Sequence, residues 1–371
     1  MRTHSFSLKG ANTPKVVGTG LVALDVLLQD GDRSPDVALG GSTGNVLAIL
    51  AFLGWSAVPV ARLGKDRAGL EIKTEFSSLR ADTRFLMEAD LAMTPVVYQS
   101  PGDSGKTHKF SFSCPFCGRK RSFIPESDTA FCNHVLSQVD STDVFYFDRV
   151  TPWALHLAEA YRERGALVMF EPSQIDSNGS AFQRAIWSSN ILKYADDRIE
   201  QLESFDRSKV DVEIQTAGAN GLQFRRPSST EHGWHPLDAL KISDVADTAG
   251  AGDWCTAGLL YYLSKRVKER PLSFQQLSNG LRYGQMLAAL NCMLPGARGL
   301  ARSFDKNFTR VQLSKLLDDD PQGKLCSLNW SSVVSAFLAS SRSDSSLPEN
   351  KARQFVVDKK LTHLCCEPLP H

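Results

Sequence analysis

The sequence lacks the features that direct a chain to a membrane or to nucleic acid. Its N-terminus has no apolar segment like that of a secretory signal. No apolar run is long enough to span a bilayer, and the stretch 45–55 is too short. The 42 Lys and Arg residues balance 41 Asp and Glu residues, for a formal charge of +1. We therefore expect a cytoplasmic protein with neither nucleic acid nor membrane as a partner.

The eight cysteines are not expected to form disulfides, because thiols in the cytoplasm are mostly reduced. Residues 114–118 read Cys-Pro-Phe-Cys-Gly, which resembles one knuckle of a zinc ribbon, in which a turn lets two thiolates converge on one ion. Cys132 and His134 are the candidates for the remaining two ligands of a Zn²⁺ site with Cys114 and Cys117. The alternative is a pair of reduced cysteines in a tight β-turn.

Short β-branched runs alternate with amphipathic stretches along most of the chain. This alternation predicts βαβ units and a mainly parallel sheet with helices on both faces, a three-layer α/β/α sandwich. Ligands of such folds bind beyond the carboxyl ends of the strands. We expect strands at 15–18, 58–63, 143–147, 166–170 and 209–215, and helices at 45–54, 67–80, 152–164, 252–267 and 274–293.

Two regions break the alternation. Residues 94–134 contain expected strand segments at 95–99 and 108–113 and no good helix, so we expect a small β excursion from the main sheet. Residues 303–371 begin with a helical stretch and then become rich in Ser, Asp and Lys, which predicts a partly disordered C-terminal extension. Residues 1–14 form an N-terminal tail, which leaves one main domain over 15–302.

The strongest chemical signal is residues 247–253, Asp-Thr-Ala-Gly-Ala-Gly-Asp, ahead of an apolar helix. Small residues leave backbone N–H groups uncovered, and the helix adds its positive N-terminal end, so Gly250, Ala251 and Gly252 would hold a phosphate. Asp253 would lie in the first helical turn, where its carboxylate can accept the proton of an attacking hydroxyl. This pattern predicts phosphoryl transfer to a hydroxyl group. The alternative is an ordinary capped helix N-terminus.

Residues 247–253 resemble the C-terminal signature of the ribokinase-like, or PfkB, carbohydrate and nucleoside kinases. Four further segments are similar to motifs of that family and follow in its order. They are the Gly-Gly-x-x-x-Asn of residues 40–45, the strand and Gly-x-Asp of 61–69, the Thr-x-Gly-x-x-Gly of 216–221, and the Pro-Gly-Ala of 295–297. The resemblance covers roughly residues 15–302, the expected main domain.

The resemblance implies a kinase that uses ATP. It places the acceptor hydroxyls on Asp25, Gly40, Gly41 and Asn45, and an ionised Asp25 would accept two hydrogen bonds from a vicinal diol. It places the nucleotide beside Thr216, Gly218 and Gly221, with Asn291 near the adenine. Residues 26–40 and 94–134, with the zinc knuckle at 114–117, would form the lid, which in this family covers the substrate and often mediates dimers. We therefore also expect a homodimer through the lid.

The sequence departs from the family at the Asn-x-x-Glu motif that helps to organise magnesium and phosphate. Alignment on Lys193 places Ala195 and Arg198 at those positions, so the motif is absent. Mg²⁺ is still expected, because the phosphates of ATP need charge neutralisation. Glu171, which follows the strand at 166–170, is a second candidate for a carboxylate on the metal side. Asp196, Asp197 and Glu200 are further candidates, and the sequence does not choose among them.

Three functions remain open from the sequence. The first is an ATP-dependent kinase whose acceptor is a sugar or sugar derivative, and the second is a nucleoside kinase. The third is a non-catalytic sensor that binds ATP or a sugar and acts through a partner protein. The missing Asn-x-x-Glu favours the sensor, whereas the intact Asp253 favours an enzyme. Acceptor choice depends on lid side chains and pocket shape, which a family resemblance does not transfer.

Overall fold

The structure is a computed structural model that describes residues 13–28, 36–90, 92–101, 108–125, 128–199, 202–227, 233–242, 245–263 and 271–304. Residues 1–12 of the expected tail and residues 305–371 of the expected extension lie outside these ranges. Within these ranges, no helix is both long and apolar enough to cross a membrane.

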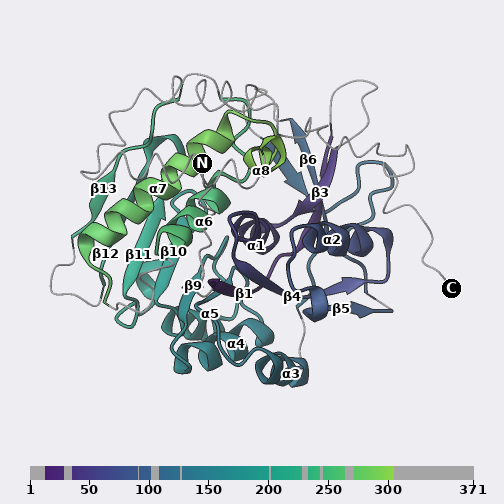
Figure 1. Ribbon diagram of the computed structural model, residues 1–371, viewed down its shortest axis with the longest axis horizontal. Coiled ribbons are helices and arrows are strands. Elements are labelled where there is room, and N and C mark those ends of the chain that lie inside the picture. The colour runs from purple at the N-terminus through teal and green to yellow at the C-terminus, as the bar shows by residue number, and fades with distance from the viewer. Residues whose placement is uncertain are drawn as a thin grey trace, which may run out of the picture.

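The body is built on a nine-stranded sheet in the order β13-β12-β11-β10-β9-β8-β1-β4-β5 (Figure 1). All neighbours pair in parallel except β11-β12 and β12-β13, which are antiparallel. The strands are β1 (Lys15–Thr19), β4 (Ser56–Gly64), β5 (Leu86–Ala89), β8 (Val144–Phe147), β9 (Leu167–Phe170), β10 (Ile191–Ala195), β11 (Val212–Thr216), β12 (Leu222–Arg225) and β13 (His235–Leu237). The mainly parallel sheet predicted from the sequence is therefore confirmed.

Helices cover both faces of this sheet, as predicted. They are α1 (Ser42–Phe52), α2 (Arg67–Ser78), α3 (Ala130–Gln138), α4 (Pro152–Glu163), α5 (Gly179–Trp187), α6 (Ala251–Leu263), α7 (Phe274–Cys292) and α8 (Gly299–Ser303). Short 3₁₀ turns lie at Thr83–Phe85, Leu202–Ser204 and Gly218–Asn220. Several helices begin at side-chain caps: Asp66 accepts from Gly69 N, Thr151 from Ala154 N, and Ser273 forms a capping box with Gln276.

Alternation along the strands divides the interior into two cores. Successive side chains of a strand point to opposite faces of its sheet. Val144 and Tyr146 of β8 accordingly pack in the cluster that includes α1, α2, α6 and α7. Phe145 and Phe147 pack in the cluster that includes α3, α4 and α5. Figure 1 shows these helix groups on separate sides of the sheet, and the three-layer sandwich is confirmed.

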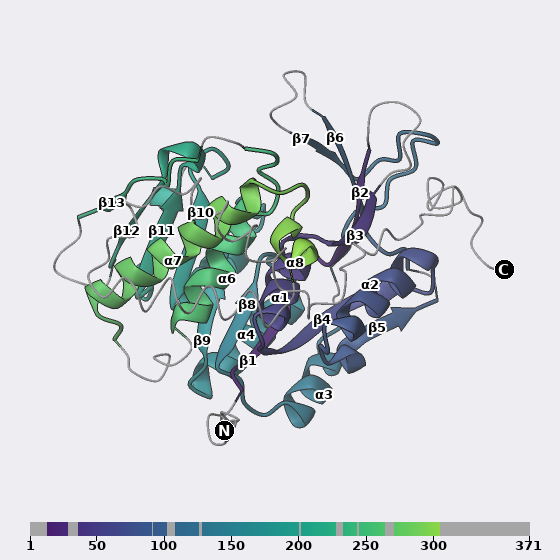
Figure 2. The same cartoon turned by 45° about the horizontal axis from the view of Figure 1, so that its top comes forward.

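A second sheet of four strands, in the order β3-β2-β6-β7, stands away from the body (Figure 2). It consists of β2 (Ala23–Leu27), β3 (Asp36–Gly40), β6 (Val96–Pro101) and β7 (His108–Ser111). We call this four-stranded sheet the lid. One expectation for the lid is wrong: residues 130–134 begin α3, which packs in the core of the body beside α4, so the region is not free of helix.

Candidate active site

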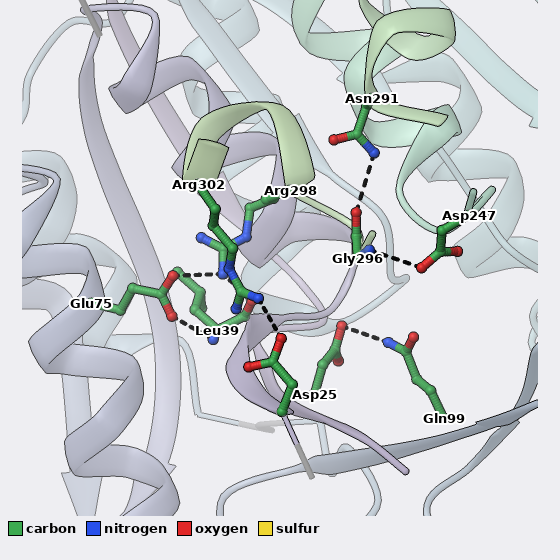
Figure 3. Close-up of polar contacts among 10 residues, drawn as sticks. Asp25, Leu39, Glu75, Gln99, Asp247, Asn291, Gly296, Arg298 and Arg302 are labelled. Carbon is green, nitrogen blue, oxygen red and sulfur yellow. Dashed lines mark hydrogen bonds and ion pairs between the residues drawn. The ribbon is translucent and has the colours of Figure 1, made fainter. Parts of the chain in front are cut away.

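The loop of residues 247–252 is held in place by buried hydrogen bonds. Asp247 accepts from Ala249 N at 2.8 Å and from Gly296 N at 2.9 Å. The Asn291 amide donates to Ala249 O at 3.2 Å and, as Figure 3 shows, to Gly296 O at 3.3 Å. Asn291 is fully buried and also accepts from Leu300 N. Its predicted place beside the adenine is therefore wrong, because its polar atoms join two loops inside the protein.

The turn at Gly250 fits only a residue without a side chain. Its φ is +74°, and an added Cβ would lie 2.2 Å from Ala297 O. Within the loop, Ala251 N donates to Thr248 O at 3.2 Å, so this N–H already has a partner. Ala251 would therefore help an anion to approach through its small side chain and not through its N–H. Gly252 is exposed at the second position of α6, where helix N–H groups have no partner within the helix. The loop therefore presents an anion-binding helix end at Gly252.

Asp253 lies in the first turn of α6, and α1 packs against this helix. The Asn45 amide of α1 donates to Asp253 Oδ2 at 2.9 Å. This bond joins a residue predicted to bind the acceptor substrate to the predicted base. Burial raises the pKa of Asp253 from 3.8 to about 8, and the nearby Glu171 carboxylate adds to this rise. The Asn45 hydrogen bond and the Lys193 ammonium oppose it. A carboxyl with a pKa near neutrality suits a general base.

A buried ion pair lies beneath the loop. Lys193 of β10 pairs with Glu171 Oε1, and its ammonium also donates to Gly252 O at 3.3 Å. The second oxygen of Glu171 accepts from Thr256 at 2.6 Å and from Tyr146 at 3.2 Å. Both carboxylate oxygens are thus engaged by protein groups. The pair supports the backbone at Gly252, and the place of Glu171 on the magnesium side stays a prediction.

Asp25 lies on β2 and is 5% exposed, and its carboxylate accepts a hydrogen bond at Oδ2 from Gln99 Nε2 of β6 at 2.9 Å (Figure 3). Burial raises the pKa of Asp25 to about 7, against the attraction of Arg298 and the backbone N–H of Gly41. Gly40 makes room for this carboxylate, because an added Cβ would lie 1.9 Å from the Asp25 Cγ. The position of Asp25 thus explains why the first residue of the Gly-Gly motif is a glycine.

Two arginines of the α8 segment connect the loop at 295–298 with the lid. Arg298 is 5% exposed, pairs with Glu75 of α2 at 2.7 Å and donates to Leu39 O of β3 (Figure 3). Arg302 pairs with Asp36 at the start of β3 at 2.8 Å. Because Gly296 N donates to Asp247, the same segment contacts both the loop of residues 247–252 and the lid strand β3.

The predicted nucleotide residues lie together after β11. Thr216 ends this strand and its hydroxyl donates to Tyr194 O at 3.3 Å, while Ala217 N donates to Gly221 O. Gly218 has a φ of +53°, and a Cβ there would meet no atom within 4 Å. Gly221 has a φ of +100°, and a Cβ there would lie 2.3 Å from Leu237 O. Gly218 thus faces open space at the carboxyl end of the sheet, whereas Gly221 closes the hairpin.

The predicted zinc site is wrong. Cys132 is fully buried on α3, its pKa is raised to about 12 by burial, and its thiol approaches Trp153 O at 4.0 Å. Cys114 begins a five-residue turn closed by the bond from Gly118 N to Cys114 O. Across the described ranges, no group of three or more His, Cys, Asp or Glu could hold a metal. His134 lies on α3 beside Phe85 and Phe131.

Three residues of this site were not singled out from the sequence as site residues. Gln99 and Arg298 are buried polar side chains, and Lys193 served only as an alignment position. A polar residue within an apolar run was the available signal for Gln99, since the expected strand 95–99 is otherwise largely apolar. A lysine inside the β-branched run at 191–195 was the corresponding signal for Lys193.

The chain is similar to known kinases in sequence and in fold. No family model matches the sequence. Aminoimidazole riboside kinase of Salmonella typhimurium is 26% identical over 273 residues, which cover 67% of this chain and 81% of that protein. ATP-dependent ribose-1-phosphate kinase of Halopiger xanaduensis is 26% identical over 296 residues, 73% of this chain and 92% of that protein.

Solved structures with the same fold include two kinases determined with nucleotides. Fructokinase from Xylella fastidiosa with bound ATP has a TM-score of 0.60 and 17% identity, and covers 77% of this chain and 94% of that one. Aminoimidazole riboside kinase from Salmonella enterica, with its riboside and an ATP analogue, has a TM-score of 0.60 and 20% identity, and covers 82% and 99%.

The sandwich, the lid and the loop at the head of α6 define the ribokinase-like class of fold. The relatives that match by sequence are kinases of this class, so the predicted resemblance to the PfkB kinases is confirmed. The chain is therefore similar in sequence and in fold to small-molecule kinases of the PfkB type.

Proposed function

We propose that this kinase transfers the γ-phosphoryl group of ATP to a hydroxyl of a sugar or sugar derivative, with Asp253 as the base. The observation that carries the proposal is the hydrogen bond from Asn45 to Asp253. It brings a residue that is expected to bind the phosphoryl acceptor next to the base, beside the loop of residues 247–252. The kinase relatives favour this activity over the non-catalytic sensor.

In this mechanism Asp253 accepts the proton of the attacking hydroxyl while the helix end at Gly252 stabilises charge on the transferring group. Asn45 donates to one oxygen of Asp253 and so orients the carboxylate toward the acceptor. Asp25 and Gly40 hold the hydroxyls that do not react. The segment Thr216 to Gly221 borders the nucleotide. Closure of the lid over the acceptor would exclude water and limit hydrolysis of ATP.

Mg²⁺ would reach the site mainly with the nucleotide. This ion usually keeps several waters and binds to phosphates and one or two carboxylates rather than to a protein cage. The described residues fit this mode, because they include no cluster of three or more potential ligands. The ion would neutralise phosphate charge.

A nucleoside-like acceptor is the second candidate, and one feature of the lid favours it. Ala23 and Val97 share a small apolar cluster with Leu21, and Phe112 and Phe123 pack against it. Ala23 lies two residues before Asp25 in β2, and Val97 lies two residues before Gln99 in β6. Positions two apart in a strand share a face, so Ala23 and Val97 face the same side of the lid as these polar residues. A ribose with a flat ring attached would match this combination of polar and apolar surface. One named relative is a riboside kinase.

Transfer of labelled γ-phosphate from ATP to a panel of sugars, sugar phosphates and nucleosides tests the proposal. Labelled product from one class names the acceptor class. Binding of ATP without transfer to any acceptor would contradict the proposal. The homodimer through the lid and the cytoplasmic location remain parts of the proposal, and sedimentation of the purified protein tests the first of them.

A further inference from the structure

Three acceptor oxygens at this site are buried and have no hydrogen-bond partner within the protein. They are Asp25 Oδ1, Asn45 Oδ1 and Gln99 Oε1. The three residues are 5%, 4% and 3% exposed. A buried polar atom without a partner costs free energy, so native proteins rarely keep one unless it serves a ligand. Here three such atoms occur at one site, and all three accept hydrogen bonds when the Asp25 carboxyl is ionised, above its pKa of about 7.

The parallel pairing of β2 and β6 brings Asp25 and Gln99 together. Asp25 lies opposite Val97 in the register, and Gln99 lies two residues further along, opposite Leu27. Positions two apart in a strand share a face, so both side chains project from the same face of the lid. The donation from Gln99 Nε2 to Asp25 Oδ2 fixes both groups, with Asp25 Oδ1 and Gln99 Oε1 left as neighbouring acceptors.

We propose that Gln99 is a substrate-binding and specificity-determining residue that forms, with Asp25, a clamp for two neighbouring hydroxyls of the acceptor. One hydroxyl donates to Asp25 Oδ1 and the other to Gln99 Oε1. The third unpartnered oxygen, Asn45 Oδ1, faces the end of the acceptor that reacts, because Asn45 contacts Asp253. The inference rests on the proposed function and adds to it the residue that reads the second hydroxyl.

The clamp defines a class of acceptor. Both of its oxygens require donors, and a vicinal diol supplies two at the right separation. A phosphate group at the same place would bring only acceptor oxygens and negative charge next to the Asp25 carboxylate. The acceptor is therefore a compound whose clamp end is an unphosphorylated vicinal diol, such as the 2- and 3-hydroxyls of a ribosyl group.

The test compares diols with analogues that lack one hydroxyl. The probes are D-ribose and adenosine, each with its 2-deoxy and 3-deoxy counterpart, and the readouts are kcat/KM with ATP and calorimetric affinity without it. In the wild-type protein, each deoxy analogue of the accepted probe should bind and react at least ~100-fold less well, because one buried oxygen stays unpaired. Failure of the wild type to bind either diol would overturn the clamp.

Gln99→Leu removes the amide and nearly preserves side-chain size. We expect affinity for the diol to fall by ~10- to 100-fold, and one of the two deoxy analogues then to equal the diol within ~3-fold, while the other keeps its penalty through Asp25. Gln99→Asn, which withdraws the oxygen by one methylene, should show the same pattern and decides the question if the leucine variant does not fold. Tyr98→Phe, on the opposite face of β6, is the matched control and should keep both penalties.

Unchanged penalties for both deoxy analogues in the Gln99 variants would overturn the proposal and leave Gln99 as a support for Asp25. This outcome differs from failure of the proposed function, in which the wild-type protein binds the diol with the expected discrimination but transfers no phosphoryl group. Loss of affinity without loss of discrimination would likewise assign Gln99 a structural role.

Discussion

Replacement of Asp253 by Asn should slow the reaction and stabilise the fold at the same time. The carboxyl has a folded-state pKa of about 8 against 3.8 in the unfolded chain, chiefly because it is buried. Since the folded pKa is the higher one, ionisation favours the unfolded state. The penalty is absent below pH 3.8, grows as the pH rises, and is complete above about pH 8.

The magnitude follows from the size of this shift. One pKa unit corresponds to ~1.4 kcal/mol, so full burial would cost the wild type several kcal/mol at pH 8.5. The Asp253 residue keeps part of its surface exposed to solvent, so water screens part of this cost. We expect Asp253→Asn to raise the free energy of unfolding by ~1–3 kcal/mol at pH 8.5 and to leave it nearly unchanged at pH 4. The amide oxygen of the variant can still accept from Asn45.

Urea denaturation of both proteins at pH 4, 6 and 8.5 measures this difference. The control is Asp206→Asn: Asp206 is exposed, and a hydrogen bond from Ser208 N lowers the pKa of its carboxyl, so the stability change should have the opposite sign above pH 4. An Asp253→Asn variant that is less stable than the wild type at pH 8.5 would refute the reasoning, as would a difference that does not depend on pH.

Three further changes test other parts of the site. Gly40→Ala should raise KM for the acceptor at least ~10-fold with little change in affinity for ATP, because the new methyl would collide with Asp25; equal KM values would contradict this. Lys193→Met should lower the free energy of unfolding by ~3 kcal/mol in urea denaturation, since Glu171 loses its buried partner, and an unchanged midpoint would be evidence against that role. Metal analysis of the purified protein should find no zinc, and one equivalent would restore the zinc knuckle.

The features predicted correctly from the sequence are those whose cause is local. The small residues at 248–252 lie where α6 begins, and the alternation of strand and helix patterns reflects which faces are buried. These signals depend on neighbours within one turn or one strand. The fold class and the kinase class could be predicted for this reason.

The errors concern residues whose partners lie far along the chain. The Gln99 side chain meets Asp25, 74 residues away, only when β2 and β6 pair. Cys132 is near the knuckle in sequence, yet α3 turns its thiol into the core beside α4. Asn291 was placed by resemblance, whereas its amide donates inside the protein to Ala249 O, 42 residues away. No local pattern contains this information.

The most direct test of the central claim is the pH dependence of phosphoryl transfer by the wild type and by Asp253→Asn, with the acceptor that the panel identifies. The account predicts that wild-type kcat/KM falls about tenfold per pH unit below about pH 8, where Asp253 becomes protonated, and that the variant is ~10²- to 10⁴-fold slower and loses this dependence. A variant that transfers phosphate at the wild-type rate, with the same pH profile, would contradict the assignment of Asp253 as the base.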